Sequence, residues 1–167
     1  MRFKILLSLI LIVIINFANA QDLNSDKNEK IIQYENIAEI VQEGDYIFIA
    51  NKAISQNGKL VNLSPESNMF IISDNVASAV LPFYGEFYKE NSTSDKTLIK
   101  FKDVVSDYKI KLKENKFRIQ IKFRVKTSQD LFNCSLKISH NGDAELTINC
   151  HERSTISYTG NVGVLVQ

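Results

Sequence analysis

Residues 108–125 read YKIKLKENKFRIQIKFRV and alternate apolar with polar side chains almost without a break. This period of two is typical of strands that bury one face, because successive side chains point to opposite sides of a sheet. Glu114-Asn115 interrupts the pattern and indicates a two-residue turn, which would set Leu112 opposite Phe117. The apolar faces of the two strands then coincide, so the stretch predicts a hairpin with one side in a core.

A second hairpin is predicted over residues 131–150, where the alternation continues. The turn His140-Asn141-Gly142 leaves two registers open. With Gly142 in the left-handed position of a three-residue loop, Cys134 faces Ile148. With the loop one residue later, Cys134 faces Cys150. In both registers the inward side chains are Phe132, Cys134, Leu136, Ile138, Ala144, Leu146, Ile148 and Cys150.

Before and after these hairpins in the chain, the sequence predicts one helix and several short strands. Apolar residues recur at near-helical spacing from Ile32 to Val41, and Gly44 follows, which indicates an amphipathic helix over about residues 29–43. Residues 46–50 are apolar on both faces, so we place the helix over one of them. The expected fold class is α+β, mainly antiparallel β, with one N-terminal helix packed on a curved antiparallel sheet of about eight to ten strands or an open barrel. The other strands are expected at 69–72, 76–81 and 155–166.

The first twenty residues have the pattern of a secretory signal peptide. Arg2 and Lys4 precede an apolar run, and small residues before the Ala20–Gln21 bond suit cleavage there. A transmembrane anchor needs about 20 apolar residues, more than this run contains. We therefore expect a periplasmic or secreted protein without a membrane span. Its parts are a signal peptide at 1–20, a flexible polar tether at 21–29 and a single globular domain at 30–167.

Export bears on the two cysteines of the chain, Cys134 and Cys150. An even number of cysteines in an exported protein favours a disulfide bond, whereas two buried free thiols would act as small apolar side chains. Both hairpin registers put the two sulfur atoms on the inner face. We expect the Cys134–Cys150 disulfide after a small local adjustment, because opposed β-carbons lie slightly beyond the usual bridging distance.

The composition is that of an ordinary globular chain: 167 residues, 44% hydrophobic and 23% charged, with a formal net charge of +1. A chain so near neutrality lacks the bulk positive charge of proteins that grip nucleic acid electrostatically. The sequence contains no H-E-x-x-H, no paired C-x-x-C and no G-x-S-x-G motif. We expect no catalytic residues, no metal, no cofactor and no nucleic-acid partner.

Basic side chains recur on the outward face of the 109–126 hairpin. The two-residue turn would set Lys111 opposite Arg118 and Lys113 opposite Lys116, although like charges across a sheet are unfavourable. Such a sheet either meets an anion, such as a lipid phosphate or an acidic polymer, or presents a solvated face, which is the commoner case. The candidate anion surface comprises Lys109, Lys111, Lys113, Lys116, Arg118, Lys122 and Arg124.

Four other residues are candidates for a binding site: Phe83, Tyr84, Arg153 and Tyr158. The two aromatic rings lie beside Pro82, where a strand is expected to bend, and they line the rim of a pocket or fill a corner of the core. Arg153 follows the last long strand. Its guanidinium either clamps a carboxylate or phosphate or ties the sheet edge to Glu or to backbone carbonyls.

Three patches of sequence, in this order, resemble a known family. They are LPFYG at 81–85, NGDAEL at 141–146 and RSTISYTG at 153–160. With the signal peptide and the short helix, they are similar to the exported Bacteroidota family called domain of unknown function 4251, over about residues 30–162. The resemblance implies a bacterial envelope location and supplies no activity, substrate or catalytic residue.

The leading functional hypothesis is a non-enzymatic exported envelope protein that binds a ligand or an envelope protein through a concave or edge surface of its sheet. One alternative is a small envelope hydrolase or isomerase that uses Arg153 and carboxylates brought together only in space. Another is an anion- or lipid-headgroup-binding surface on the 109–126 hairpin.

Overall fold

The computed structural model describes residues 25–64, 68–88, 96–128 and 130–165. The predicted signal peptide and its cleavage point lie outside these residues, as do residues 21–24 of the predicted tether. Within the described residues, nine strands form one sheet in the order β2-β1-β3-β4-β5-β6-β7-β8-β9, and β1 also pairs with β9.

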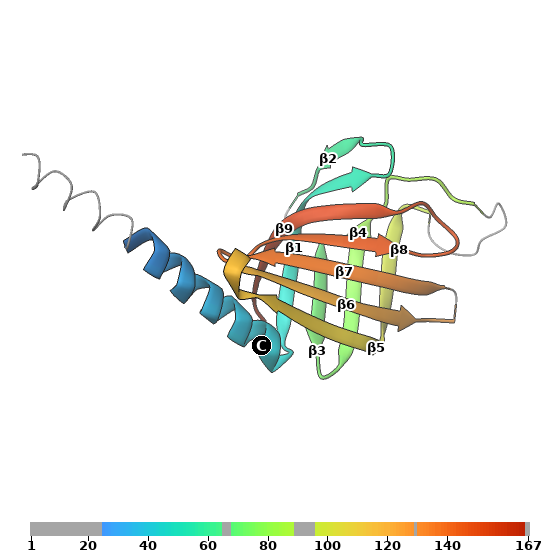
Figure 1. Cartoon of the computed structure of the whole chain (residues 1–167). Coiled ribbons are helices and arrows are strands. Elements are labelled where there is room, and N and C mark those ends of the chain that lie inside the picture. Colours follow the sequence, from blue (N-terminus) through green and yellow to red (C-terminus); the bar gives the residue numbers. More distant parts are fainter. Residues whose placement is uncertain (1–24, 65–67, 89–95, 129, 166–167) are drawn as a thin grey trace, which may run out of the picture.

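The pairing of β1 with β9 closes eight of the strands into an antiparallel barrel (Figure 1). The predicted fold class is confirmed, and the barrel is closed rather than open. Short β2 (Leu60–Asn62) pairs with β1 beyond the part of β1 that pairs with β3. The barrel strands are β1 (Tyr46–Ser55), β3 (Met69–Ser73), β4 (Val76–Pro82), β5 (Leu98–Lys113), β6 (Arg118–Lys126), β7 (Leu131–Ser139), β8 (Asp143–Asn149) and β9 (Ile156–Val164).

The seam between β1 and β9 depends on a glycine. Gly160 lies opposite Ala50 on one side and Ala144 on the other. A Cβ atom added to Gly160 would lie 1.9 Å from the Ile49 carbonyl oxygen and 2.9 Å from the Cα atom of Ala50. Only a residue without a side chain allows the two backbones to approach this closely.

Inward side chains fill the interior of the barrel. Phe70 stacks on Phe123 with ring centroids 5.5 Å apart, and Phe101 lies 4.8 Å from Phe132 by the same measure. An eight-stranded barrel is just wide enough for its own side chains to fill it. Ile110 and Leu112, predicted on the inner face of the 108–125 hairpin, are 36% and 39% exposed. The other predicted inward residues of β6, β7 and β8, and Cys150, are buried: Ile119, Ile121, Phe123, Val125, Phe132, Cys134, Leu136, Ile138, Ala144, Leu146, Ile148 and Cys150.

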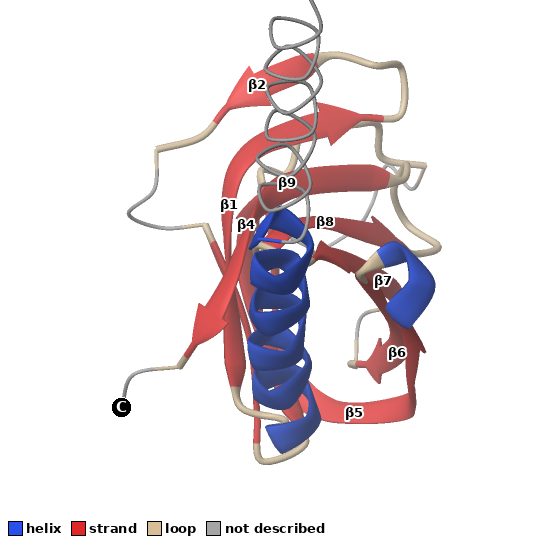
Figure 2. Cartoon of the chain, turned by 60° about the vertical axis from the view of Figure 1, so that its left-hand side comes forward, coloured by secondary structure: helices blue, strands red, loops and turns tan. Residues whose placement is uncertain are grey.

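The N-terminal helix covers one end of the barrel rather than a face of its sheet (Figure 2). Its described part spans residues 25–43, so residues 25–29 of the predicted tether are helical. Tyr34, Ala38 and Val41 enter the core, whereas Ile32, expected on the apolar side, is 57% exposed. Gly44 ends the helix with a positive φ of 84°, as its position predicted.

The turn between β5 and β6 is longer than expected. A short 3₁₀ helix at Glu114–Lys116 is followed by Phe117 in the left-handed conformation, and Leu112 pairs with Ile119. The predicted two-residue turn was therefore wrong. The register differs from the expected one by two residues, and because the period of a strand is two, the paired residues keep their predicted faces. Lys116 and Phe117, expected in the strand, belong to the turn.

Candidate functional site

Arg153 is buried at the end of the barrel opposite the helix. Its side chain is 4% exposed, and its guanidinium carbon lies 5.2 Å from the ring centroid of Phe83 and 4.6 Å from that of Phe87. Nη1 donates a hydrogen bond of 2.9 Å to the carbonyl oxygen of Leu98. Contact of a desolvated guanidinium with aromatic faces is favourable, so the arginine fastens residues 83–88 and the start of β5 to the connection between β8 and β9.

The four candidate binding residues separate into a buried group and an exposed ring. Phe83 and Tyr158 are buried near Arg153, and the Tyr158 hydroxyl donates a 2.8 Å hydrogen bond to the carbonyl oxygen of Pro82. Burial raises the pKa of the Tyr158 hydroxyl, and the nearby positive charge of Arg153, which lowers this pKa, offsets only part of the effect. Tyr84 is 40% exposed and lines a separate pocket of about 430 Å³. The arginine thus ties the sheet edge to a backbone carbonyl, the second of its two sequence-based interpretations.

Asp130 organises the same end of the barrel, and the sequence patterns did not single it out. Its carboxylate accepts hydrogen bonds from the backbone N–H groups of Leu131 (2.8 Å), His151 (3.1 Å) and Glu152 (3.3 Å). Burial alone would raise the pKa of this carboxyl, but the hydrogen bonds from His151, the Cys150 thiol, Leu131 and Glu152 hold it below its usual value. The partners of Asp130 lie up to 22 positions away in the chain, across the sheet, so the local sequence does not reveal them.

The predicted disulfide is wrong. Cys134 and Cys150 are both free cysteines, and both are buried. Cys134 pairs with Ile148, which is the first of the two registers considered. Cys150 is then a diagonal neighbour, and diagonal positions lie about 7–8 Å apart, whereas the Cα atoms of a disulfide lie about 4.4–6.8 Å apart. The Cys150 thiol is hydrogen-bonded to Asp130 instead, and burial together with that carboxylate raises its pKa to about 12.

The candidate anion surface is assembled on the outer face of β5 and β6, in a corrected register. Lys109 lies directly opposite Lys122, and Lys113 opposite Arg118. Lys111 faces Gln120 rather than Arg118, and Lys116 belongs to the turn. Arg124 forms an exposed ion pair with Asp107, 3.1 Å between Nη1 and Oδ2. Two like-charged pairs therefore remain face to face on this sheet.

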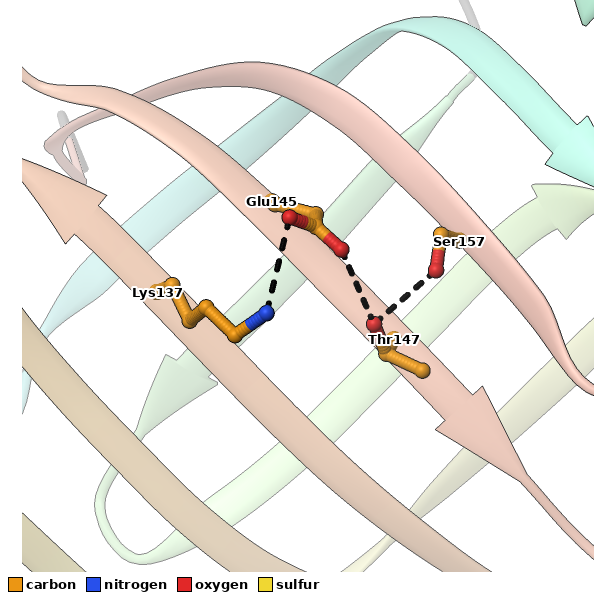
Figure 3. Close-up of polar contacts among 4 residues, drawn as sticks. All are labelled: Lys137, Glu145, Thr147 and Ser157. Atoms are coloured by element: carbon orange, nitrogen blue, oxygen red, sulfur yellow. Dashed lines mark hydrogen bonds and ion pairs between the residues drawn. The ribbon is translucent and has the colours of Figure 1, made fainter.

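The outer face of β7 to β9, beside this surface, carries charges of both signs, and Figure 3 shows its Lys137, Glu145, Thr147 and Ser157. Lys137 on β7 pairs with Glu145 on β8 at 3.6 Å. The hydroxyl groups of Thr147 and Ser157 lie 2.9 Å apart across β8 and β9. The excess of positive charge is thus confined to the β5–β6 side of the barrel wall.

A groove of about 710 Å³ lies between the helix and the tip of the β5–β6 hairpin. Its apolar part includes Ile31, Ala38, Leu112 and Phe117. Its volume falls within the range of about 300–1,000 Å³ that is usual for ligand pockets. The helix contributes three glutamates at intervals of four residues, one for each turn, and the hairpin contributes a fourth. These carboxylates are Glu35, Glu39, Glu43 and Glu114.

Tyr34 also lines this groove, with its hydroxyl group unsatisfied. The side chain is 6% exposed, and its ring packs edge-on against Phe117 with centroids 6.0 Å apart. The buried hydroxyl oxygen has no hydrogen-bond partner among the residues that the structure describes. Burial and the nearby Glu114 carboxylate both raise the pKa of this phenol. The hydroxyl therefore lies near the hairpin wall of the groove, close to a negative charge.

Two features are absent from the residues that the structure describes. No three His, Cys, Asp or Glu side chains gather there in a way that could hold a metal ion. Over the same residues, no helix is both long and apolar enough to cross a membrane.

Fold and site together define a small antiparallel barrel with a filled interior, one end covered by a helix and an acidic groove beside that helix. The family model described as Domain of unknown function (DUF4251) matches residues 28–162. The chain belongs to this family, and the resemblance seen in the three sequence patches is confirmed.

The architecture is also found among solved structures. One of them is a crystal structure of a DUF4251 family protein from Bacteroides eggerthii, with a TM-score of 0.64 and 15% sequence identity, covering 80% of this chain and 88% of that one. At this identity the similarity shows the fold alone. No curated protein matches the chain.

Proposed function

We propose that this protein is a non-enzymatic envelope protein, periplasmic or secreted, that binds a partner in the groove between its helix and the β5–β6 hairpin. The observation that carries the proposal is the groove itself, in which an unpartnered Tyr34 hydroxyl lies among apolar side chains. Leaving a buried hydroxyl unpaired is unfavourable by about 1–3 kcal/mol. A partner that supplies the missing hydrogen bond would recover part of that free energy.

The filled barrel supports a site outside the interior. Phe70, Phe123 and their neighbours occupy the space that larger or emptier barrels offer to a ligand. A hydrolase or isomerase built on Arg153 has less support. The nearby Asp130 carboxylate is already engaged by three backbone N–H groups, and the arginine is held by a carbonyl and two rings.

We expect ligands of the groove to shift the backbone NMR signals of Tyr34, Ala38, Leu112 and Phe117 in a protein comprising residues 21–167. The measurement is a ¹H–¹⁵N titration with a defined panel of peptides, glycans and lipids. Leu112→Asp, which puts a charge on the apolar part of the groove, should abolish the shifts.

The matched control for this titration is Leu60→Asp, because Leu60 is 54% exposed on β2 and lies outside the groove. It should leave the shifts unchanged. Shifts confined to another surface, or an absence of shifts with every class in the panel, would count against a binding site in the groove.

A second candidate function, an anion- or lipid-headgroup-binding surface on the β5–β6 hairpin, is favoured by the Lys109–Lys122 and Lys113–Arg118 pairs. We expect Lys109→Gln/Lys122→Gln to weaken binding to vesicles containing phosphatidylglycerol at least fivefold, whereas Lys30→Gln/Lys59→Gln, with the same change in charge, has little effect. Binding should also weaken steeply with salt, because charges are screened beyond about 10 Å at 0.1 M. Co-sedimentation that is insensitive to salt, or equal for the two double variants, would refute this function.

A further inference from the structure

We infer that the groove takes a basic peptide segment in extended conformation, with Lys or Arg alternating with apolar residues. This inference rests on the proposed function and names the chemistry of the partner. It is carried by three observations: the row of carboxylates on the helix, the apolar side chains beside it, and the unsatisfied hydroxyl of Tyr34 near Glu114.

Among the described residues, no Lys or Arg side chain forms an ion pair with these carboxylates. Within the described part of the chain, the ion pairs are Arg124–Asp107 and Lys137–Glu145, and neither lies in the groove. Like charges four residues apart on a helix destabilise it by a few tenths of a kilocalorie per mole. The Glu35–Glu39–Glu43 row is therefore an arrangement that the free protein tolerates at some loss of stability and that a cationic partner would neutralise.

The spacing of the row suits an extended chain. Residues four apart on a helix are separated by about 6 Å along its axis, and alternate residues of an extended strand by about 6.6 Å. Every second side chain of an extended peptide can thus meet one glutamate. The side chains between them point the other way, toward Leu112 and Phe117 on the hairpin side of the groove.

The unsatisfied hydroxyl gives the groove a specific polar contact. Tyr34 is buried and has no partner, and Glu114 lies near it on the hairpin wall. A lysine ammonium or an arginine guanidinium carries only donors. It can donate to the Glu114 carboxylate and, once the side chains that cover the buried phenol oxygen move aside, to that oxygen as well. A neutral apolar ligand would leave the hydroxyl without a hydrogen bond and the four carboxylates without a counter-charge. An anionic ligand would be repelled by the carboxylates.

The test uses residues 21–167 and a fluorescein-labelled pentapeptide, acetyl-Lys-Leu-Lys-Leu-Lys-amide, followed by fluorescence anisotropy at low salt. The comparison peptide is acetyl-Glu-Leu-Glu-Leu-Glu-amide. We expect saturable binding of the basic peptide and none of the acidic one. Glu39→Gln/Glu43→Gln should weaken binding at least tenfold. The control Glu29→Gln/Glu145→Gln changes the net charge equally outside the groove and should change the affinity less than twofold.

Tyr34→Phe tests the hydroxyl separately. Because the hydroxyl has no partner in the free protein, the variant should unfold at a temperature no lower than the wild type does, yet bind the basic peptide about threefold to tenfold more weakly. A lower unfolding temperature with unchanged affinity would show that the hydroxyl is structural and would overturn its assigned role.

Three further outcomes would overturn the inference. Equal loss of affinity in the two double variants would mean that only net charge attracts the peptide. A protein dimer that dissociates in Glu39→Gln/Glu43→Gln, without peptide binding, would make the occupant a second copy of this chain. If uncharged or anionic ligands shift the groove signals by NMR while the basic peptide does not, the groove remains a binding site and only the partner class is wrong.

Discussion

Gly160→Ala should destabilise the protein by about 3 kcal/mol or more, because the new methyl group has no room at the seam of the barrel. The nearest atoms are backbone: the Ile49 carbonyl oxygen at 1.9 Å and the carbonyl carbon at 2.8 Å. Backbone cannot rotate away as a side chain can, so β1 and β9 must separate. A loss of this size is a large part of the stability of a typical domain, about 5–15 kcal/mol.

The matched control is Gly163→Ala in the same strand. A Cβ atom there would meet nothing within 4 Å, so the substitution should be neutral or raise stability by up to about 1 kcal/mol through the unfolded chain. Urea denaturation followed by circular dichroism measures both variants. Equal midpoints for the two alanine variants would show that the seam relaxes freely around Gly160.

Asp130→Ala should destabilise the protein by about 3 kcal/mol, because it leaves the N–H groups of Leu131, His151 and Glu152 without their acceptor. The control is Glu145→Ala, which removes an exposed ion pair with Lys137 (Figure 3). Such pairs contribute little, about 0.5 kcal/mol. Comparable losses in the two variants would mean that the carboxylate of Asp130 does not hold this end of the barrel together.

The charge of Asp130 should also appear in the pH dependence of stability. Its pKa in the folded protein lies below the ordinary value of 3.8, so the folded state favours the ionised form. The stability that this preference supplies is complete well above pH 3.8 and is lost as the pH falls through the lower pKa of the folded protein. The free-energy difference between wild type and Asp130→Asn should therefore be constant from about pH 7 to pH 5 and shrink below about pH 4.

Period-two patterning predicted the barrel wall well because it depends only on neighbours in sequence. The turn between β5 and β6 escaped it, since Phe117 adopts a left-handed conformation with φ of 48° that its residue type disfavours. The sequence pattern also did not predict the bulge in β5. Asp107 has φ of 53° within a register shift between Ser106 and Lys109. That shift exchanges the inward and outward positions along β5.

The candidate sites show more clearly what the alternation of inward and outward side chains cannot predict. The alternation of side chains predicted that the sulfur atoms of Cys134 and Cys150 lie on one face. It could not predict the distance between them, because that distance depends on the loop at Gly142. The four-residue spacing of the helix glutamates can be read in the sequence, but that spacing alone did not indicate a site. The wall that faces them, with Leu112 and Glu114, comes from a part of the chain some seventy positions away, and only the folded barrel brings it there.

The β1–β9 seam also sets when the molecule can finish folding. Side chains of Asn51 and Asn161 are hydrogen-bonded across it at 3.1 Å although 110 positions separate them. Contacts between such distant residues slow folding, to roughly milliseconds or seconds in small β proteins. Until the last strand leaves the ribosome, β1 lacks one neighbour and the ring stays open. A barrel closed by two strands so far apart in the chain therefore cannot complete its ring until nearly all of its strands are present.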